Sequence, residues 1–275
     1  MVVQHNLTAA NTNRQLGITT SGLQKSTEKL SSGYKINRAA DDAAGLSISE
    51  KMRNQIRGLN KASDNAQDGI SLVQTAEGAL NEVHSMLQRM SELSVQAANG
   101  TNDTTDRSSI NDEIQQLKTE IERVGSTTQF NKMNILDGTF STGANKLLQV
   151  GANANQTIKV DIDALKSVVG SSLMADLKTE TATNAQSAIT VVQNSIEKLS
   201  KLRSKLGAVQ NRLEHTVANL DNISENTQSS ESRIRDTDMA EEMVQYSKNN
   251  ILQQAGQSML AQANQANQGV LSLLQ

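Results

Sequence analysis

The side chains most often used in catalysis are few in this sequence. Three histidines, His5, His84 and His215, lie on separate segments, and the chain has no cysteine. Metal sites and nucleophilic centres need two or more such groups at close spacing, as in the helical HExxH pattern. Neither that pattern nor the phosphate-binding patterns GxxxxGK[ST] and GxGxxG occurs. We therefore expect no catalytic residues, no metal and no cofactor, and the chain is predicted not to be an enzyme.

Two other groups of residues could in principle take part in catalysis or ligand binding. Asp41 and Asp42 could form a paired carboxylate site, but they come directly before a helical pattern. Negative charge is favoured at the start of a helix, so we interpret this pair as charging or capping that start. Six methionines lie near apolar stripes, where packing is the expected role: Met52, Met86, Met90, Met239, Met243 and Met259.

Composition favours long helical bundles. Of the 275 residues 36% are hydrophobic and 1% aromatic, with no tryptophan or proline. Compact cores use large aromatics, so a chain without them suits thin bundles, with disorder as the rival explanation of its polarity. The formal net charge of −3 and the lack of a basic run argue against nucleic-acid binding. The sequence shows no secretory signal in residues 1–30 and no apolar stretch of membrane-spanning length.

Periodic apolar residues predict the elements. Residues 52–97 carry a stripe at alternating steps of three and four, the repeat of a coiled-coil seam, and would form a rod of roughly 70 Å. Residues 110–124 and 189–223 repeat this pattern and are its expected partners. Between about 127 and 163, apolar residues alternate with polar or small ones, which predicts a β-hairpin. A short helix and an irregular connection remain open for 164–184, and the polar stretch 222–238 is interpreted as a connector.

The two ends of the chain carry weaker patterns that we expect to pair with each other. Near the N-terminus leucines recur every seven residues, which is one apolar residue per heptad where a full coiled-coil seam has two. Such a helix would be marginal alone. Near the C-terminus apolar residues recur mainly every four residues. The resulting terminal assembly seam is predicted to contain Leu16, Leu23, Leu30, Ile251, Met259, Val270 and Leu274.

These elements pair in a nested order: the two ends pair with each other, the two long rods pair between them, and the hairpin lies where the chain turns back. This order gives the fold class. We predict a mainly α fold, an elongated antiparallel helical bundle or coiled coil with a small β-hairpin region and paired termini. Residues 1–44 and 233–275 would form a terminal helical domain, and 45–232 a long-helix domain. The terminal pair buries little, so we expect it to order on assembly with copies of the chain. Protected terminal amides in a dilute monomer, measured by hydrogen exchange, would refute this.

Several motifs resemble the signatures of bacterial flagellins and follow the order of that family along nearly the whole chain. They are INRAADDAAGL at 36–46, LQR at 87–89 with EL at 92–93 and VQ at 95–96, TQFN at 128–131, QVGAN at 149–153 and RIRDTDMA at 233–240. The sequence departs from many flagellins in lacking large variable outer domains between the two halves.

The resemblance implies a structural subunit of the flagellar filament, a homopolymer with a central channel used for motility. In that family the chain ends form the inner tube, and the rods with the hairpin form the surrounding tube. The resemblance also implies an extracellular location, reached unfolded through the flagellar type III apparatus without a cleaved signal peptide. Implied partners are a secretion chaperone and an assembly regulator at the C-terminal region, and filament cap and junction proteins.

Some flagellins are recognised by a vertebrate Toll-like receptor, and the motifs match this surface at Arg89, Leu93 and Glu113. Ser91 stands where many recognised members have arginine. The resemblance implies that Leu93 points outward and that the seam passes through Ser94 toward Ala97 or Ala98. A buried Leu93 would count against the receptor surface but would leave the filament assignment intact.

Two alternative functions are compatible with parts of the sequence. The hook–filament junction protein shares both terminal regions, but it is expected to match the motifs of the central rod less well. A membrane-active amphipathic helical protein would need polar faces rich in lysine and arginine, and the faces here are mixed in charge. Electron microscopy of the protein after seeding separates these functions, because a filament subunit would form long hollow filaments.

Overall fold

Helices make up most of the computed structural model, which describes residues 6–140, 146–170, 173 and 179–272, the side chains of 266–272 excepted. The chain divides into a terminal unit, residues 1–54 and 226–275, and a central unit, residues 55–225. The helices are α1 (Leu7–Ser32), α2 (Ala43–Ala98), α3 (Thr104–Thr127), α4 (Leu165–Val169), α6 (Ala182–Arg235) and α7 (Met239–Ser272). The mainly α fold with a small β-hairpin region is thereby confirmed.

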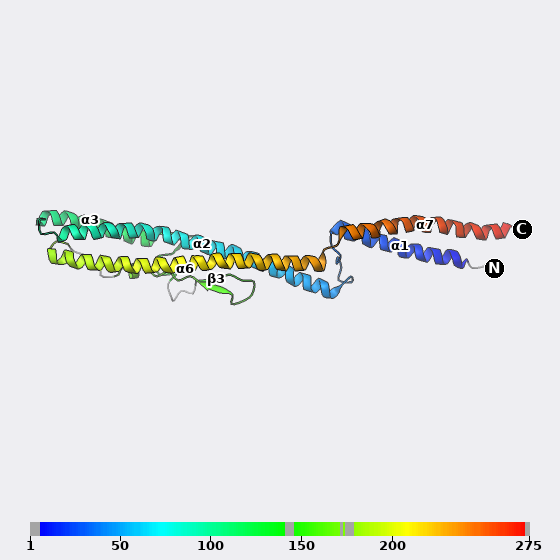
Figure 1. Cartoon of the computed structure of the whole chain (residues 1–275), viewed down its shortest axis with the longest axis horizontal. Coiled ribbons are helices and arrows are strands. Elements are labelled where there is room, and N and C mark those ends of the chain that lie inside the picture. Colours follow the sequence, from blue (N-terminus) through cyan, green and yellow to red (C-terminus); the bar gives the residue numbers. More distant parts are fainter. Residues whose placement is uncertain (1–5, 141–145, 171–172, 174–178, 273–275) are drawn as a thin grey trace. The chain divides into compact units, whose positions relative to one another are not determined.

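In the terminal unit, α1 and α7 lie side by side (Figure 1). They are antiparallel, because Asn6 at the start of α1 contacts Ala263, while Lys29 near its end contacts Glu242. Gly33 ends α1 in the left-handed conformation, with φ 76°, and its N–H donates to the Lys29 carbonyl at 2.8 Å. A residue with a Cβ is strained in that conformation, so glycine suits this C-cap.

The segment between α1 and α2 is held by two aspartates. Asp42 Oδ1 accepts the Gly45 N–H at 2.9 Å, which satisfies one of the unpaired donors at the start of α2. Asp41 Oδ2 accepts the N–H groups of Arg38, at 2.9 Å, and Asn37, at 3.3 Å. Asp42 therefore caps the start of α2, as interpreted, whereas Asp41 holds the backbone of the segment before this helix.

The acid sensitivity of the terminal unit should depend on Asp41. The hydrogen bond from the Arg38 N–H, followed by that from Asn37, lowers the pKa of Asp41 below its ordinary 3.8. A folded pKa that is depressed adds stability above the unfolded value, and this stability is lost as pH falls through the folded value. Asp41→Asn should therefore melt below the parent chain at neutral pH, with a difference that shrinks below about pH 4.

Circular dichroism melting curves of the two chains over this pH range test the prediction. Asp64→Asn, at an exposed aspartate whose carboxylate pairs with the nearby Lys61, is the control. A melting difference between Asp41→Asn and the parent that stays constant down to strongly acidic pH would contradict it.

A second cluster in the terminal unit joins the residues before α2 to the end of α6. Tyr34 and Asp236 form an isolated antiparallel bridge, and the Arg235 guanidinium lies 4.6 Å from the centre of the Tyr34 ring. Arg235 also forms an ion pair with Glu50 of α2 at 2.7 Å. A cation over an aromatic face gains electrostatic attraction, so Arg235 links three segments through one side chain.

In the central unit, α2, α3 and α6 lie side by side (Figure 1) and share one core with the segments 135–140 and 160–169 and with Leu173. Buried residues of α2 and α6 recur at steps of three and four, as the coiled-coil pattern predicts. Ion pairs connect the helices at their edges: Arg203 of α6 lies 3.6 Å from Glu77 of α2.

The prediction of a connector at 222–238 is wrong for most of that stretch, because α6 is helical to Arg235. Polar contacts replace apolar ones along this part of the contact with α2. Ser224 Oγ donates to Asn60 Oδ1 at 2.7 Å, and Ser63 Oγ donates to Asp221 Oδ1 at 3.1 Å. A helix can continue without an apolar stripe where such pairs satisfy its buried side chains.

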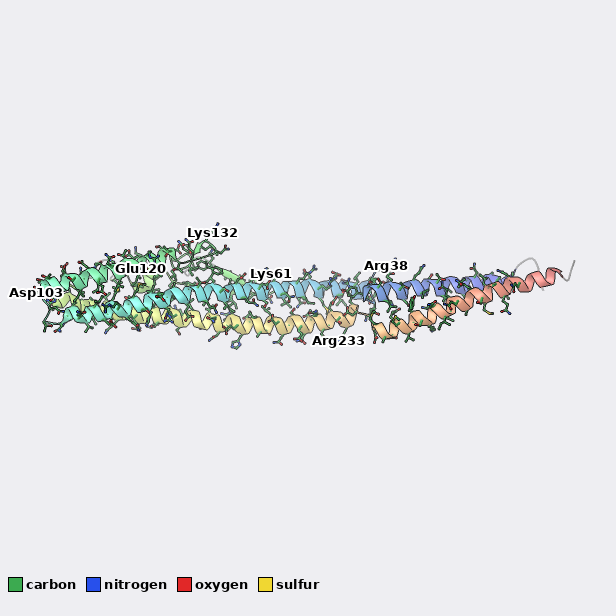
Figure 2. The ribbon with its side chains drawn as sticks, turned by 90° about the horizontal axis from the view of Figure 1, so that it is seen from above. Arg38, Lys61, Asp103, Glu120, Lys132 and Arg233 are labelled. Carbon is green, nitrogen blue, oxygen red and sulfur yellow. The ribbon has the colours of Figure 1, made fainter. Side chains whose placement is uncertain are left out.

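Two small antiparallel hairpins cover part of the central unit. The strands β1 (Gln129–Phe130) and β2 (Met133–Asn134) meet at a turn where Asn131 and Lys132 have positive φ, and Figure 2 labels Lys132 there. The strands β3 (Leu147–Gln149) and β4 (Thr157–Lys159) pair with Leu148 opposite Ile158. Both regions lie within the predicted hairpin segment.

The second hairpin lies close to α2. A Cβ at Gly58 would lie 2.9 Å from the Ala152 Cβ, and a Cβ at Gly69 would collide with Leu148. Glycine at these helix positions lets another backbone approach closely. These contacts explain two of the four glycines in α2, a helix with good apolar periodicity.

The division into units differs from the predicted domain limits. It falls inside α2 and α6, near residues 54 and 226, instead of at 44/45 and 232/233. Both helices continue through it, so no break in secondary structure marks the boundary. None of the described helices has an apolar stretch long enough to cross a membrane.

Candidate assembly and receptor surfaces

The first candidate surface is formed by α1 and α7. Leu16, Leu23 and Leu30 are half-buried on α1. Leu16 lies against Gly256 of α7, where a Cβ would be 3.3 Å from the Leu16 Cδ1. The heptad leucines of α1 therefore lie on the side of this helix that faces α7.

The prediction for α7 is wrong in register. Ile251 and Met259 are 67% and 57% exposed and point away from α1. Residues spaced by four advance about 40° around a helix at each step, so such a stripe drifts off one face. The half-buried residues of α7 instead repeat at about 3.5: Glu242, Tyr246, Asn249, Asn250, Gln253, Gly256, Leu260 and Ala263. The predicted seam contacts of Val270 and Leu274 lie outside the described residues.

The contact between α1 and α7 combines half-buried apolar residues with polar pairs. Lys29 Nζ lies 3.4 Å from Glu242 Oε2, and the Asn6 side-chain amide donates to the Ala263 carbonyl at 3.0 Å. Ser26 is the buried residue of the described part of α1. The exposed apolar residues of α7 take no part in this contact, so they stabilise little within one chain.

Large apolar side chains stay exposed on the terminal unit, and the sequence pattern missed several of them. We call them the exposed apolar set of the terminal unit; most lie on the half of α7 turned away from α1. Its members are Leu7, Ile18, Ile48, Met239, Met243, Val244, Ile251, Leu252 and Met259. The available signal was that α7 holds more apolar residues than one seam requires. Exposed sets of this kind commonly mark interaction sites.

The second candidate surface joins α2 and α3. Arg89 of α2 donates from Nε to Glu113 Oε1 at 3.0 Å, and its guanidinium lies 3.3 Å from Glu92. The hydrogen bond to Glu113, followed by that to Glu92, raises the pKa of Arg89 above its ordinary value. The Arg89 and Glu113 side chains are 50% and 45% exposed, so the structure brings these two predicted residues together at the surface.

Leu93, the third predicted receptor residue, is not part of this surface. It is 2% exposed and belongs to the shared core, so the expectation of an outward Leu93 is wrong. Ser94 and Ala97 are also buried, and Ser94 Oγ donates to the Met90 carbonyl at 2.7 Å. Because α2 is covered by both α3 and α6, two adjacent stripes of it are buried here. This burial counts against the receptor surface as predicted from the three residues.

The histidines and acidic residues form no metal cluster in the part of the chain that the structure describes. His84 lies on α2 beside Gln88, with 3.1 Å between the His84 Nε2 and the Gln88 side-chain nitrogen. His215 lies on α6, and His5 is outside the described residues.

Comparisons with known proteins give consistent similarities. Residues 3–141 match the family described as "Bacterial flagellin N-terminal helical region", and residues 189–274 match "Bacterial flagellin C-terminal helical region". The chain is 58% identical to a flagellin of Halalkalibacterium halodurans and 52% identical to one of Bacillus subtilis, over the whole of each chain. The crystal structure of Bacillus cereus flagellin is similar with a TM-score of 0.51 and 33% identity, over 57% of this chain and 88% of that one.

Proposed function

The chain belongs to the bacterial flagellin family, and from that premise we propose that its terminal unit joins copies of the chain into a filament. As a flagellin it is a structural subunit of the extracellular flagellar filament and not an enzyme. The finer proposal concerns which surface drives assembly.

One observation carries the proposal: the exposed apolar set leaves many large side chains of the terminal unit in water. Burying apolar surface gives about 25 cal/mol per Å². The exposed apolar set gains this free energy only when another surface covers it. In a homopolymer that surface belongs to neighbouring copies, which order the terminal helices as they bind.

Seeded growth tests the proposal against the hook–filament junction alternative. Purified chain is added to short filament fragments and followed by electron microscopy. Continuous elongation into long hollow filaments is expected. Short caps that stop growing after one layer would instead favour a junction protein.

The proposal extends to export and delivery. The chain would travel unfolded through the flagellar type III apparatus, with a secretion chaperone and an assembly regulator bound at the C-terminal region. A filament cap would then guide its folding at the tip. The exposed apolar residues of α7 support the chaperone part, because an unpolymerised chain needs this surface covered to stay soluble.

Recognition by a vertebrate Toll-like receptor is proposed in a narrower form, through Arg89 and Glu113 without Leu93. The support is the exposure of this ion pair and its position across two helices. Alanine at both positions should reduce receptor signalling by the monomer at least tenfold, since interface arginines are frequent hot spots. A receptor-reporter assay measures this.

The matched control is Glu120→Ala with Arg123→Ala, which removes another exposed pair of α3, labelled at Glu120 in Figure 2. That variant should signal like the parent. Unchanged potency of the Arg89 and Glu113 variant would end the receptor proposal and leave the filament proposal untouched.

A further inference from the structure

We propose that Asn99, in the loop between α2 and α3, is a site of spontaneous deamidation that the folded loop accelerates. Asn99 is followed by Gly100, and this dipeptide occurs once in the chain. Figure 2 labels Asp103, which follows the loop directly and lies at the end of the central unit. The proposal needs no partner other than water.

The reaction has two balanced steps. The Gly100 amide nitrogen loses its proton to water and attacks the Asn99 side-chain carbonyl carbon, Cγ. The bond from Cγ to the side-chain nitrogen Nδ2 then breaks, and Nδ2 takes up a proton from water and leaves as ammonia. The product is a cyclic succinimide. Water then opens the ring at either carbonyl, which leaves aspartate at position 99 or its β-linked isomer. No electron transfer takes place.

The nucleophile is free to react. Gly100 follows the end of α2, and no residue in the described parts of the chain accepts a hydrogen bond from its N–H. Nothing lies within 4 Å of where a Cβ at Gly100 would be, so the surroundings of this residue are open. Asn99 itself is exposed, which lets water reach the succinimide and ammonia leave.

Arg107 of α3 activates this nucleophile. Its guanidinium donates from Nη2 to the Asn99 main-chain carbonyl at 3.1 Å and from Nε to the Ala97 carbonyl at 3.0 Å. The first carbonyl belongs to the same peptide group as the Gly100 nitrogen. A cation bonded to that oxygen stabilises the amide anion that forms when the nitrogen loses its proton.

The electrophile is polarised as well. The Thr101 N–H points to the Asn99 side-chain oxygen, Oδ1, at 3.4 Å. Negative charge develops on that oxygen as the nitrogen attacks, and a fixed donor aimed at developing charge lowers the barrier. The loop therefore places one donor at the oxygen of the electrophile and one cation at the nucleophilic peptide.

Deamidation would change the loop chemically. It adds one negative charge at the C-terminal end of α2, where negative charge is unfavourable, close to the Arg107 cation that can pair with it. The β-linked product also lengthens the main chain by one carbon. The Asn102 side chain, which donates to the Gln96 carbonyl at 2.6 Å, would then have to shift.

The full-length chain is incubated at neutral pH, folded and in urea, and the peptide that contains position 99 is followed by mass spectrometry and isoaspartate labelling. The folded chain should convert faster than the denatured chain. Arg107→Gln should slow the folded reaction about tenfold, the factor expected for loss of one charged hydrogen bond. In urea this variant should react like the parent.

Arg123→Gln on the same helix is the matched control and should convert at the parent rate. Asn99→Gln should remove the signal from this peptide. Circular dichroism checks that Arg107→Gln is folded; if it is not, Arg107→Lys, which keeps the charge, must retain most of the acceleration. A folded rate at or below the denatured rate, or equal rates for Arg107→Gln and the parent, overturns the proposal.

Discussion

Replacing Ile251 and Met259 together with aspartate is expected to abolish filament growth and leave the helices of the monomer intact. Both side chains are exposed and turned away from α1, so their replacement removes no contact within the chain. In a filament they would be covered by a neighbouring copy. Burying an unpaired charge there costs several kcal/mol for each ion. Two such charges per subunit, repeated at every contact, should prevent elongation.

Seeded elongation followed by electron microscopy measures the effect, with circular dichroism of the monomer as a check on folding. The control is Ile251→Val with Met259→Leu, which keeps both positions apolar and should elongate readily. Elongation of the aspartate variant at the parent rate would show that these residues stay in water in the filament. The surface proposed for the terminal unit would then be wrong.

Leu93→Ala is expected to reduce the free energy of unfolding of the central unit by about 2–5 kcal/mol, because it removes a fully buried side chain and leaves a cavity. Leu93 is buried in the shared core, and Ile110 and Ile114 of α3 belong to the same core. Urea unfolding followed by circular dichroism measures the change. Receptor signalling lost in this variant would therefore reflect unfolding as well as any contact.

Val95→Ala is the matched control for that measurement. Val95 lies two residues further along α2 and is 57% exposed. Its truncation should change the unfolding free energy by no more than about 0.5 kcal/mol. Equal effects of the two substitutions would mean that Leu93 is exposed in solution, as the family resemblance implies, and would restore it to the receptor surface.

The central helices could be predicted from sequence because their apolar residues repeat at 3.5 over many turns. Leu80, Leu87 and Met90 of α2 are all fully buried, as their spacing indicates. Periodicity gives the face of a helix but not how many partners cover it. The spacing of Leu93, three residues after Met90, places it in the buried stripe, as the structure has it; the family resemblance, and not the periodicity, led to the expectation of an outward Leu93.

The terminal helices could be predicted only in part. The sequence indicated that the two ends pair, and they do so through α1 and α7. The register of α7 was wrong because its contact with α1 uses polar and small residues such as Asn249 and Gly256. Apolar periodicity cannot detect such a seam. The same limit hid the last turns of α6, where Ser224 contacts Asn60 of α2.

The candidate surfaces were predictable to different degrees. Only the family resemblance identifies Arg89 and Glu113 as candidates. From the sequence pattern alone, charged residues on a helix are expected to form a solvent-exposed face without a specific role. Their ion pair depends on how α2 and α3 pack, which the short loop between them indicates only coarsely. Ile251 and Met259 were selected as apolar residues, and only the fold shows that they face away from the chain itself.

The placement of the two tyrosines gives this chain an optical property. Tyr34 stacks against Arg235, and Tyr246 is half-buried on α7, so both belong to the terminal unit. The chain has no tryptophan, and the central unit carries phenylalanine as its aromatic residue. Intrinsic fluorescence above the phenylalanine emission therefore comes from the terminal unit alone. Ordering of that unit during polymerisation can be followed in real time without a label.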